Sequence, residues 1–246
     1  MDVQDVTTGN GGTPESKPFF SIVMPYKDAY DSIGQAIETI RGQTYKNWEL
    51  IIVNDGSDEN MLLPILAHFK DERIRYYYKE WSGIAQTRNF GNQKAKGDWI
   101  VVCDADDIWL SNRLKLTKRY IEKYPDRDFI YGGIFWGSAS GLAVREYWKP
   151  MPLTAEKLRE GKQVIIHGSC AYRRKVALET PYRREQKVND DFWFIIDCWN
   201  KRYKFGIIQR PLMIYRVLPD GVSKTHYLEI QKEIKEKLKT QHIRND

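Results

Sequence analysis

The sequence has no hydrophobic run long enough to cross a bilayer, and only three of its 246 residues are cysteine. Cys103, Cys170 and Cys198 are an odd number without metal-ligand spacing, so they predict neither a disulfide framework nor a zinc site. Residues 1–17 contain no apolar segment of the secretory type, and we expect them to form a disordered lead-in. These absences together predict a cytoplasmic protein with reduced cysteines.

Signatures of nucleic-acid binding are also missing. No zinc finger and no aromatic-basic RNA motif occurs, and 39 basic against 33 acidic residues give a moderate net charge of +6. Such an excess fits phosphorylated ligands or an anionic membrane surface. Aromatic residues are abundant, with 8 tryptophans and 15 tyrosines. Because aromatic faces stack on sugar rings and bases, we expect some of these residues to line a ligand cleft. The missing motifs predict that there is no nucleic-acid partner.

The first half of the chain alternates apolar strands with helices. We expect strands at 19–24, 50–53, 74–78 and 99–103, and helices at 32–41, 62–69 and 84–94. Pro25 is expected to end the first strand, and Ser32 with Gln35 to form a capping box on the first helix. This alternation predicts an α/β fold with a mostly parallel central sheet flanked by helices, in which ligands bind beyond the carboxyl ends of the strands.

The second half is less regular and predicts a smaller mixed portion. We expect helices at 112–123 and 191–199, and strands at 129–136, 142–148, 164–166 and 205–208. Residues 18–223 are therefore interpreted as one domain, with a nucleotide-binding half at 18–108 and an acceptor-binding half at 109–223.

The last segment, 224–246, is expected to be a basic amphipathic helix. Its apolar side chains fall on one face, formed by Tyr227, Ile230, Ile234 and Leu238. Three interpretations remain open. The face docks on its own domain, it mediates self-association, or it lies peripherally on an anionic membrane at the inner face.

An acidic cluster ends the strand at 99–103. Asp104, Asp106 and Asp107 follow directly, and Ala105 leaves room for a ligand between the first two. Crowded carboxylates at a strand end need a partner, and hard oxygen ligands suit Mg²⁺ or Mn²⁺. The alternative is an acidic turn before an Asp-capped helix.

Three motifs, in order, resemble those of the family 2 glycosyltransferases. Residues 43–57 read QTYKNWELIIVNDGS, similar to the family's QTYxNxELIIVDDGS with Asn54 as the one change. Residues 87–91, TRNFG, resemble ARNxG, and residues 104–107 match the family's DADD. The resemblance runs from about Phe19 to Ser223. It implies a GT-A fold, a Rossmann-like nucleotide-diphospho-sugar transferase fold, and an inverting hexosyl- or N-acetylhexosaminyltransferase.

The resemblance implies that the acidic cluster holds Mn²⁺ or Mg²⁺ against the donor diphosphate, where a cation compensates the charge of the leaving group. Asp106 would be the direct metal ligand, and Asp104 would hold the metal or the ribose. Asp107 would cap the next helix or orient the donor sugar. His226 would complete the metal shell, unless it is structural.

Other residues are assigned to the donor, a UDP-sugar by default. Asp55 would accept the base N–H, and Pro25, Tyr26 and Asp28 would form a loop along the base and ribose. Lys27 and Asp28 stand where the family commonly has Tyr and Asn, which leaves the nucleotide open. Two arginines complete the set. Arg88 would reach the diphosphate or the sugar, or form a local surface ion pair, and Arg216, in a YR…GxS-like segment that closes with 221–223, would clamp phosphate.

The acceptor hydroxyl needs a general base. Residues 189–195 resemble the family's ED motif before an aromatic helix, which makes Asp191 the base. A one-residue slip would give the role to Asp190, and one of the two is expected to cap the helix. The acceptor, a glycan or glycolipid of the cell envelope, would stack on candidate tryptophans, of which at least one is expected to pack in the core instead: Trp136, Trp148 and Trp193. The segment His167–Cys170 would line its pocket.

Other families fit the pattern poorly. A haloacid dehalogenase-type phosphatase carries its Asp-x-Asp after the first strand, an EF-hand does not tolerate Ile108 at a ligand position, and a dinucleotide-binding fold needs G-x-G-x-x-G after Met24. The remaining alternative is a binding module that holds a nucleotide sugar or glycan without transfer. Presence of both the metal pair and the base pair favours an enzyme.

Overall fold

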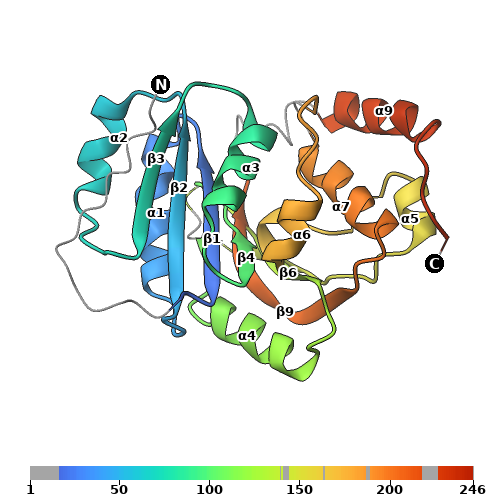
Figure 1. Cartoon of the computed structure of the whole chain (residues 1–246), viewed down its shortest axis with the longest axis horizontal. Helices are drawn as coiled ribbons and strands as arrows, with labels where there is room; N and C mark the ends of the chain where they lie inside the picture. The colour runs from blue at the N-terminus through green and yellow to red at the C-terminus, as the bar shows by residue number, and fades with distance from the viewer. Residues whose placement is uncertain are drawn as a thin grey trace.

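The computed structural model describes residues 17–138, 140, 144–162, 164–186, 189–217 and 227–245. Its elements form two portions side by side, with the first strands on the left of Figure 1 and the C-terminal helices on the right. Three expectations fall outside the described residues. These are the disordered lead-in apart from Lys17, the placement of His226, and the closing 221–223 of the YR…GxS-like segment.

Four strands of the first portion are parallel. Their spatial order is β3 (Ile74–Lys79), β2 (Trp48–Asp55), β1 (Phe20–Tyr26) and β4 (Trp99–Val102). Nearly every residue of β1, β2 and β4 is buried, because helices cover both faces of this sheet. All four carboxyl ends therefore lie at one edge.

The sheet continues into a mixed portion. β4 pairs antiparallel with β8 (Ala171–Arg173), which is followed in order by β6 (Phe129–Gly137), β9 (Phe205–Arg216) and β5 (Ile108–Trp109), and β7 (Val144–Trp148) pairs with β6. β6 and β9 are parallel to each other. The expected α/β fold with its smaller mixed portion is confirmed.

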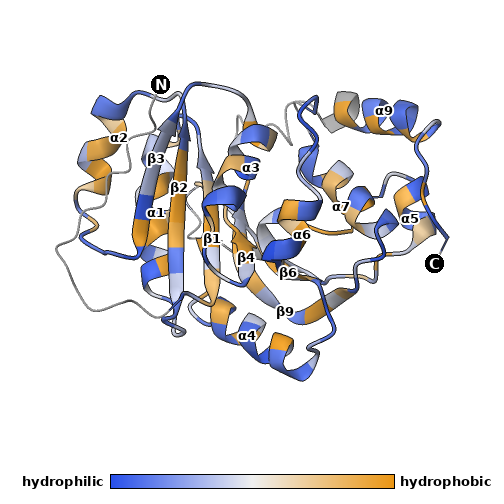
Figure 2. Ribbon diagram, viewed as in Figure 1, coloured by the Kyte–Doolittle hydropathy of each residue, from blue (hydrophilic) through white to orange (hydrophobic). Residues whose placement is uncertain are grey.

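Helices cover the sheet on both faces (Figure 1). On one face lie α1 (Tyr30–Arg41), α2 (Glu59–Leu66) and α4 (Arg113–Lys123); on the other lie α3 (Ile84–Lys94), α6 (Arg174–Glu179) and α7 (Asp190–Asn200), with α5 (Ala155–Arg159) and α9 (Tyr227–Leu238) beside α7. Alternate strand residues supply the two cores. Ile22 and Met24 face α1, whereas Val23 faces α3. The apolar stretches of β1 and β2 stand out in Figure 2.

Two expectations about the first strand and helix are wrong. β1 continues through Pro25 to Tyr26, because Pro25 stands opposite Val53 of β2 while the pairing with β4 extends only to Val23. The capping box does not form. Ser32 bonds the carbonyl of Ala29, the residue before α1, and no side chain caps this helix.

The expected strand at 164–166 is also wrong. Val164 and Ile165 are buried in the core without joining the sheet, and a short 3₁₀ turn, η1 (His167–Ser169), follows them. The real strand here is β8. Buried apolar side chains in an irregular segment and in a short strand give the same sequence pattern, so periodicity alone cannot separate them.

The C-terminal helix docks on its own chain. Ile230 and Ile234 are buried in the same core as α5 and α7, and Leu238 packs against that core. The apolar face of α9 is therefore used within the molecule. Among the described residues, no helix is long and apolar enough to span a bilayer.

Candidate active site

The carboxyl edge of the parallel strands gathers most of the residues assigned from sequence. Asp55 ends β2, and Asp104 lies two residues beyond β4. Asp190 and Asp191 open α7, from the other portion of the fold. Arg88 of α3 contacts both Asp104 and Asp190, so the structure brings the metal and base candidates together.

The acidic cluster is a closed turn. The amide of Asp107 donates to the carbonyl of Asp104 at 3.0 Å, and the amide of Asp104 donates back to Oδ2 of Asp107 at 3.1 Å. Asp107 is buried, and desolvation together with the charges of Asp104 and Asp106 holds its pKa well above the usual range. Asp107 thus shapes the turn. The expectation that it caps the next helix is wrong, because α4 begins only at Arg113 and is preceded by Asn112.

A residue missed by the sequence reasoning lies beneath this turn. Arg113 is buried, donates to the carbonyl of Val102 at 3.0 Å and lies 3.8 Å over the ring of Trp109. Burial lowers its pKa to about 10, while the charge of Asp107 opposes that shift. Arg113 occupies the apolar stripe of α4 together with Thr117 and Ile121. The sequence signal that could have revealed Arg113 was a charged residue at a position of the helix that faces the core.

Asp106 fits a cation ligand. Burial and the charge of Asp104 raise its pKa to about 6, and no lysine or arginine side chain in the described ranges forms a salt bridge with it. The same ranges contain no cluster of three or more acidic, His or Cys side chains that could cage a metal. A Mg²⁺-type ion needs only one or two carboxylates when substrate phosphates supply other ligands, so Asp106 with Asp104 fits such an ion.

Arg216 supports this turn from β9. Its Nε donates to the backbone carbonyl of Asp106, and one terminal nitrogen donates to Oε1 of Gln35 at 2.9 Å. Nη2 is buried and has no hydrogen-bond partner within the part of the chain that is described. The predicted phosphate clamp would use Nη2, because Nε and the other terminal nitrogen already donate to Asp106 and Gln35.

Asp55 is buried, and both of its oxygens have partners in the protein. Oδ1 accepts from Lys79 at 2.5 Å and from the amide of Ser82 at 2.9 Å, and Oδ2 accepts from the amide of Gly83 at 3.0 Å. These bonds order the 80–83 connection, where Trp81 is 69% exposed beside Gly56. Recognition of the nucleotide base by Asp55 remains a prediction. In the structure, the Asp55 carboxylate holds the 80–83 connection in place.

The β1 end is less open than expected. Pro25 and Tyr26 lie within β1, and Tyr26 is 1% exposed, which makes both residues part of the core. Asp28 is exposed with a positive φ of 50°, salt-bridged to Lys27 at 2.9 Å, and its amide bonds the hydroxyl of Ser57 at 2.8 Å. Only Lys27 and Asp28 therefore present side chains to solvent at this strand end.

The base candidates stand in different environments. Asp190 is buried and pairs with Arg88. Asp191 accepts the amide of its neighbour Phe192 at 2.8 Å within the first turn of α7. The residue before this helix is Asn189 and no side chain among the described residues caps it, so the expectation that one of the two acids caps the helix is wrong. Burial and the charge of Asp190 raise the pKa of Asp191 to about 6, and the charge of Arg88 opposes that shift. A carboxylate poised near neutral pH suits proton abstraction.

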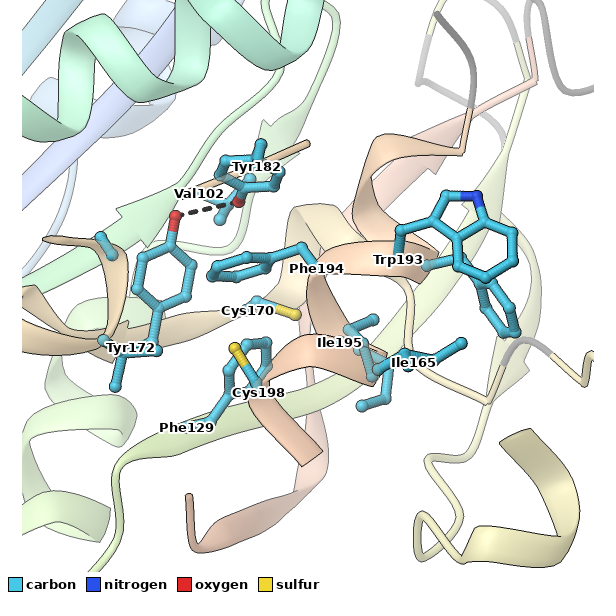
Figure 3. Close-up of a cluster of buried hydrophobic side chains, with 14 of the residues drawn as sticks. Val102, Phe129, Ile165, Cys170, Tyr172, Tyr182, Trp193, Phe194, Ile195 and Cys198 are labelled. Atoms are coloured by element: carbon cyan, nitrogen blue, oxygen red, sulfur yellow. Dashed lines mark hydrogen bonds between the residues drawn. The ribbon is translucent and has the colours of Figure 1, made fainter. Parts of the chain in front are cut away.

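The three tryptophans predicted to contact the acceptor differ in their burial. Trp193 is 1% exposed in the core shown in Figure 3, so its assignment to acceptor stacking is wrong. Trp136 is half-buried and packs edge-on against Tyr215 at 5.1 Å, and Trp148 is half-buried in β7. His167 and Cys170 are buried beside the site, and the pKa of His167 is lowered well below its usual value by burial and by the charge of Arg88.

A family model described as "Glycosyl transferase family 2" matches residues 21–180. This is more than half of the chain. The protein belongs to glycosyl transferase family 2. Residues 21–180 include the acidic turn, Arg88 and Asp55, whereas the α7 acids and Arg216 lie beyond them.

Two relatives named as glycosyltransferases cover different shares of the chain. An uncharacterized glycosyltransferase of Methanocaldococcus jannaschii is 29% identical over 208 residues, covering 82% of this chain and 71% of its own. The Escherichia coli UDP-Glc:alpha-D-GlcNAc-diphosphoundecaprenol beta-1,3-glucosyltransferase WfgD is 33% identical over 139 residues, covering 56% of this chain and 54% of its own. The chain thus spans 71% and 54% of the lengths of these two relatives.

Solved structures agree with the family 2 fold. Staphylococcus aureus TarS 1-349 in complex with UDP-GlcNAc superposes with a TM-score of 0.71 at 15% identity, covering 89% of this chain and 65% of that one. The mannosyltransferase PcManGT of Pyrobaculum calidifontis, in complex with GDP-Man and Mn²⁺, gives 0.65 at 17% identity, covering 94% and 63%. At these identities the likeness establishes the GT-A fold alone.

Proposed function

We propose that this family 2 glycosyltransferase transfers a hexose or N-acetylhexosamine from a UDP-sugar to a hydroxyl of a glycan or glycolipid, with inversion at the anomeric carbon. The observation that carries the proposal is that one arginine, Arg88, bonds one member of each of two acidic pairs, Asp104 and Asp190. Asp104 and Asp106 stand at the β4 end, and Asp190 and Asp191 stand at the start of α7.

The first pair is assigned to the donor. Asp106 and Asp104 would hold Mn²⁺ or Mg²⁺, which when bound compensates the charge of the departing nucleoside diphosphate. Arg216 fixes the carbonyl of Asp106 and keeps Nη2 for a phosphate oxygen. The Mn²⁺ in the PcManGT complex and the UDP-GlcNAc in the TarS complex support this type of donor.

The second pair is assigned to the acceptor. Asp191 accepts the acceptor's hydroxyl proton as the new bond forms, and its pKa of about 6 leaves it deprotonated at neutral pH. Asp190 is committed to Arg88 and is therefore the weaker candidate for the base. A single base without a second nucleophile predicts one in-line displacement and hence inversion.

The acceptor is proposed by analogy with a relative's name. WfgD is named for transfer to a GlcNAc linked to diphosphoundecaprenol, so we propose a cell-envelope glycan or glycolipid acceptor. The half-buried Trp136 and Trp148 are the aromatic residues left to contact its sugar.

The test is turnover with a panel of UDP- and GDP-sugars, Mn²⁺ and simple glycoside acceptors, followed by release of nucleoside diphosphate. We expect turnover with a UDP-sugar, an inverted anomeric coupling in the product's NMR spectrum, and a loss of about 10²- to 10⁴-fold in Asp191→Asn. Asp191→Asn should keep or raise the unfolding temperature, because a raised pKa means that the charged carboxylate disfavours the fold above pH 6. Full activity of Asp191→Asn, or retention, contradicts the proposal.

A further inference from the structure

Arg88 links two halves of the site that are far apart in sequence. One terminal nitrogen donates to Oδ1 of Asp104 at 2.9 Å, and the other donates to Oδ2 of Asp190. The side chains of Arg88 and Asp190 are each 7% exposed. Both terminal nitrogens already bond carboxylates, and Nε is buried without a hydrogen-bond partner among the described residues. Because the side chain is almost fully enclosed, little of the guanidinium is accessible to a diphosphate.

The helix that carries Arg88 is held rigidly. Gly91, one turn farther along α3, lies so close to the sheet that a Cβ there would come within 2.5 Å of Cγ1 of Val23. At the start of the helix, the hydroxyl of Thr87 donates to the carbonyl of Gly83. The amide of Gly83 in turn donates to Oδ2 of Asp55, which fixes the position of Gly83. The position of Arg88 is therefore set by the strands that carry the donor residues.

The same helix also holds the approach to α7. The side chain of Asn89 accepts from the amide of Tyr182 and donates to its carbonyl, each at 2.8 Å. The ring of Tyr182 lies below the Arg88 guanidinium, 5.7 Å away, and stacks on Phe194 of α7 at 4.2 Å. Figure 3 shows Tyr182 over Phe194, with its hydroxyl bonded to that of Tyr172.

We propose that Arg88 is a positioning residue that couples the donor half of the site to the catalytic base. By fixing Asp190, it fixes the first turn of α7 and hence Asp191, the next residue. It does not act as a diphosphate contact. This inference rests on the proposed function and assigns Arg88 a role different from the sugar or phosphate contact expected from sequence.

The choice of variant follows from the two carboxylates. A neutral residue at position 88 would leave two carboxylates without their shared cation, the partly buried Asp104 and the buried Asp190. Unpaired charges in these positions would destabilise the fold. Arg88→Lys keeps the charge, but a single ammonium group lacks the planar fork that meets two carboxylates at once. Asp190→Asn removes the other end of the link.

The experiment measures kcat for transfer and the Kd of UDP with Mn²⁺. In Arg88→Lys we expect kcat to fall about 100-fold, the effect of misplacing a reacting group by about 1 Å, while Kd stays within about 3-fold. A Kd raised about 10-fold or more with kcat preserved would identify a phosphate contact and overturn the inference. Because the Kd arm needs no turnover, it decides between these roles even if no donor is found and the proposed function fails.

A double-mutant cycle completes the test. If Arg88 acts through Asp190, the kcat of Arg88→Lys with Asp190→Asn should lie near that of the worse single variant; additive losses would overturn the inference. The matched control is Arg75→Lys. Arg75 forms a similarly buried pair with Glu49 at 2.7 Å, near the amino ends of β2 and β3, and its replacement should change kcat by less than about 2-fold.

Discussion

Asn54 shows how a single departure from the family motif is accommodated. Its side-chain nitrogen donates to the carbonyl of Ser57 at 3.1 Å and to the hydroxyl of Tyr76 at 3.0 Å, and its oxygen accepts from the amide of Ser57. The Tyr76 hydroxyl donates onward to Glu59. An aspartate could accept but not donate, so the family's residue would leave this network short of one donor group.

We therefore predict that Asn54→Asp destabilises the protein by about 1–3 kcal/mol, because a buried carboxylate would face acceptors. Chemical denaturation measures the loss. Asn47→Asp is the control. Among the described residues, the exposed side chain of Asn47 accepts from the amide of Phe19 and donates to nothing, so its replacement should be nearly neutral. Equal stability of Asn54→Asp and the unaltered protein would contradict the assigned network.

Asp191 gives a prediction for pH. Its pKa is raised to about 6, and only the deprotonated form can act as a base. The transfer rate should therefore fall as the pH drops through 6, by about tenfold for each pH unit below it, and level off above it. Measurement of kcat between pH 4.5 and 8 tests this. A plateau that extends below pH 5 would mean that Asp191 does not limit the rate as a base.

Secondary structure was predictable where a periodic apolar stripe met a clear end. The helix expected at 84–94 coincides with α3, and the buried stripe of α1, Ile33, Ala36, Ile37 and Ile40, is the one expected. Predictions failed where long-range contacts decide. β8 is only three residues long and exists because β4 and β6 flank it. The sequence pattern within a short segment does not show which distant strands will pair with it.

The C-terminal segment is an element whose role the structure makes testable. Arg244 donates to the carbonyl of Trp199 through Nε, and Trp199 donates back to the Arg244 carbonyl at 3.1 Å. The guanidinium also lies 4.6 Å over the Trp199 ring, and the Arg244 amide bonds Asn200 at 3.0 Å. This end of the chain is thereby attached to the C-terminal end of α7.

We predict that Arg244→Ala lowers stability by about 1–2 kcal/mol, since it removes two side-chain hydrogen bonds, to the carbonyls of Trp199 and Asn245, and one cation–π contact. In a chain of this size that corresponds to a fall of about 2–8 °C in Tm. Lys239→Ala is the control. Within the described ranges, Lys239 pairs only with the neighbouring exposed Glu236, so Tm should hardly change. Equal shifts in the two variants would show that the attachment to α7 contributes little.

At the scale of the whole molecule, the candidate site exists only because two portions of the sheet meet. Sequence motifs predicted Asp104, Asp106 and Asp191 as site residues and assigned Arg88 to the donor, which stay predictions. The motifs did not find Arg113. Both arginines act on carboxylates or carbonyls brought to them by the fold. Their roles depend on distances between strand ends and α7, which no spacing along the chain encodes.

The proposed use of Asp106 by both cation and nucleotide predicts a linkage between their affinities. A diphosphate adds ligands to an ion held by only two carboxylates, so UDP should raise Tm more with Mn²⁺ than with EDTA. Asp106→Asn should abolish that difference. The half-buried carboxylate that it removes has a pKa raised to about 6, so the ligand-free variant should be at least as stable at pH 8 as the unaltered protein. Thermal unfolding across the four combinations of metal and nucleotide measures the linkage. An equal UDP shift with and without Mn²⁺ would contradict the metal site, because independent ligands shift stability independently.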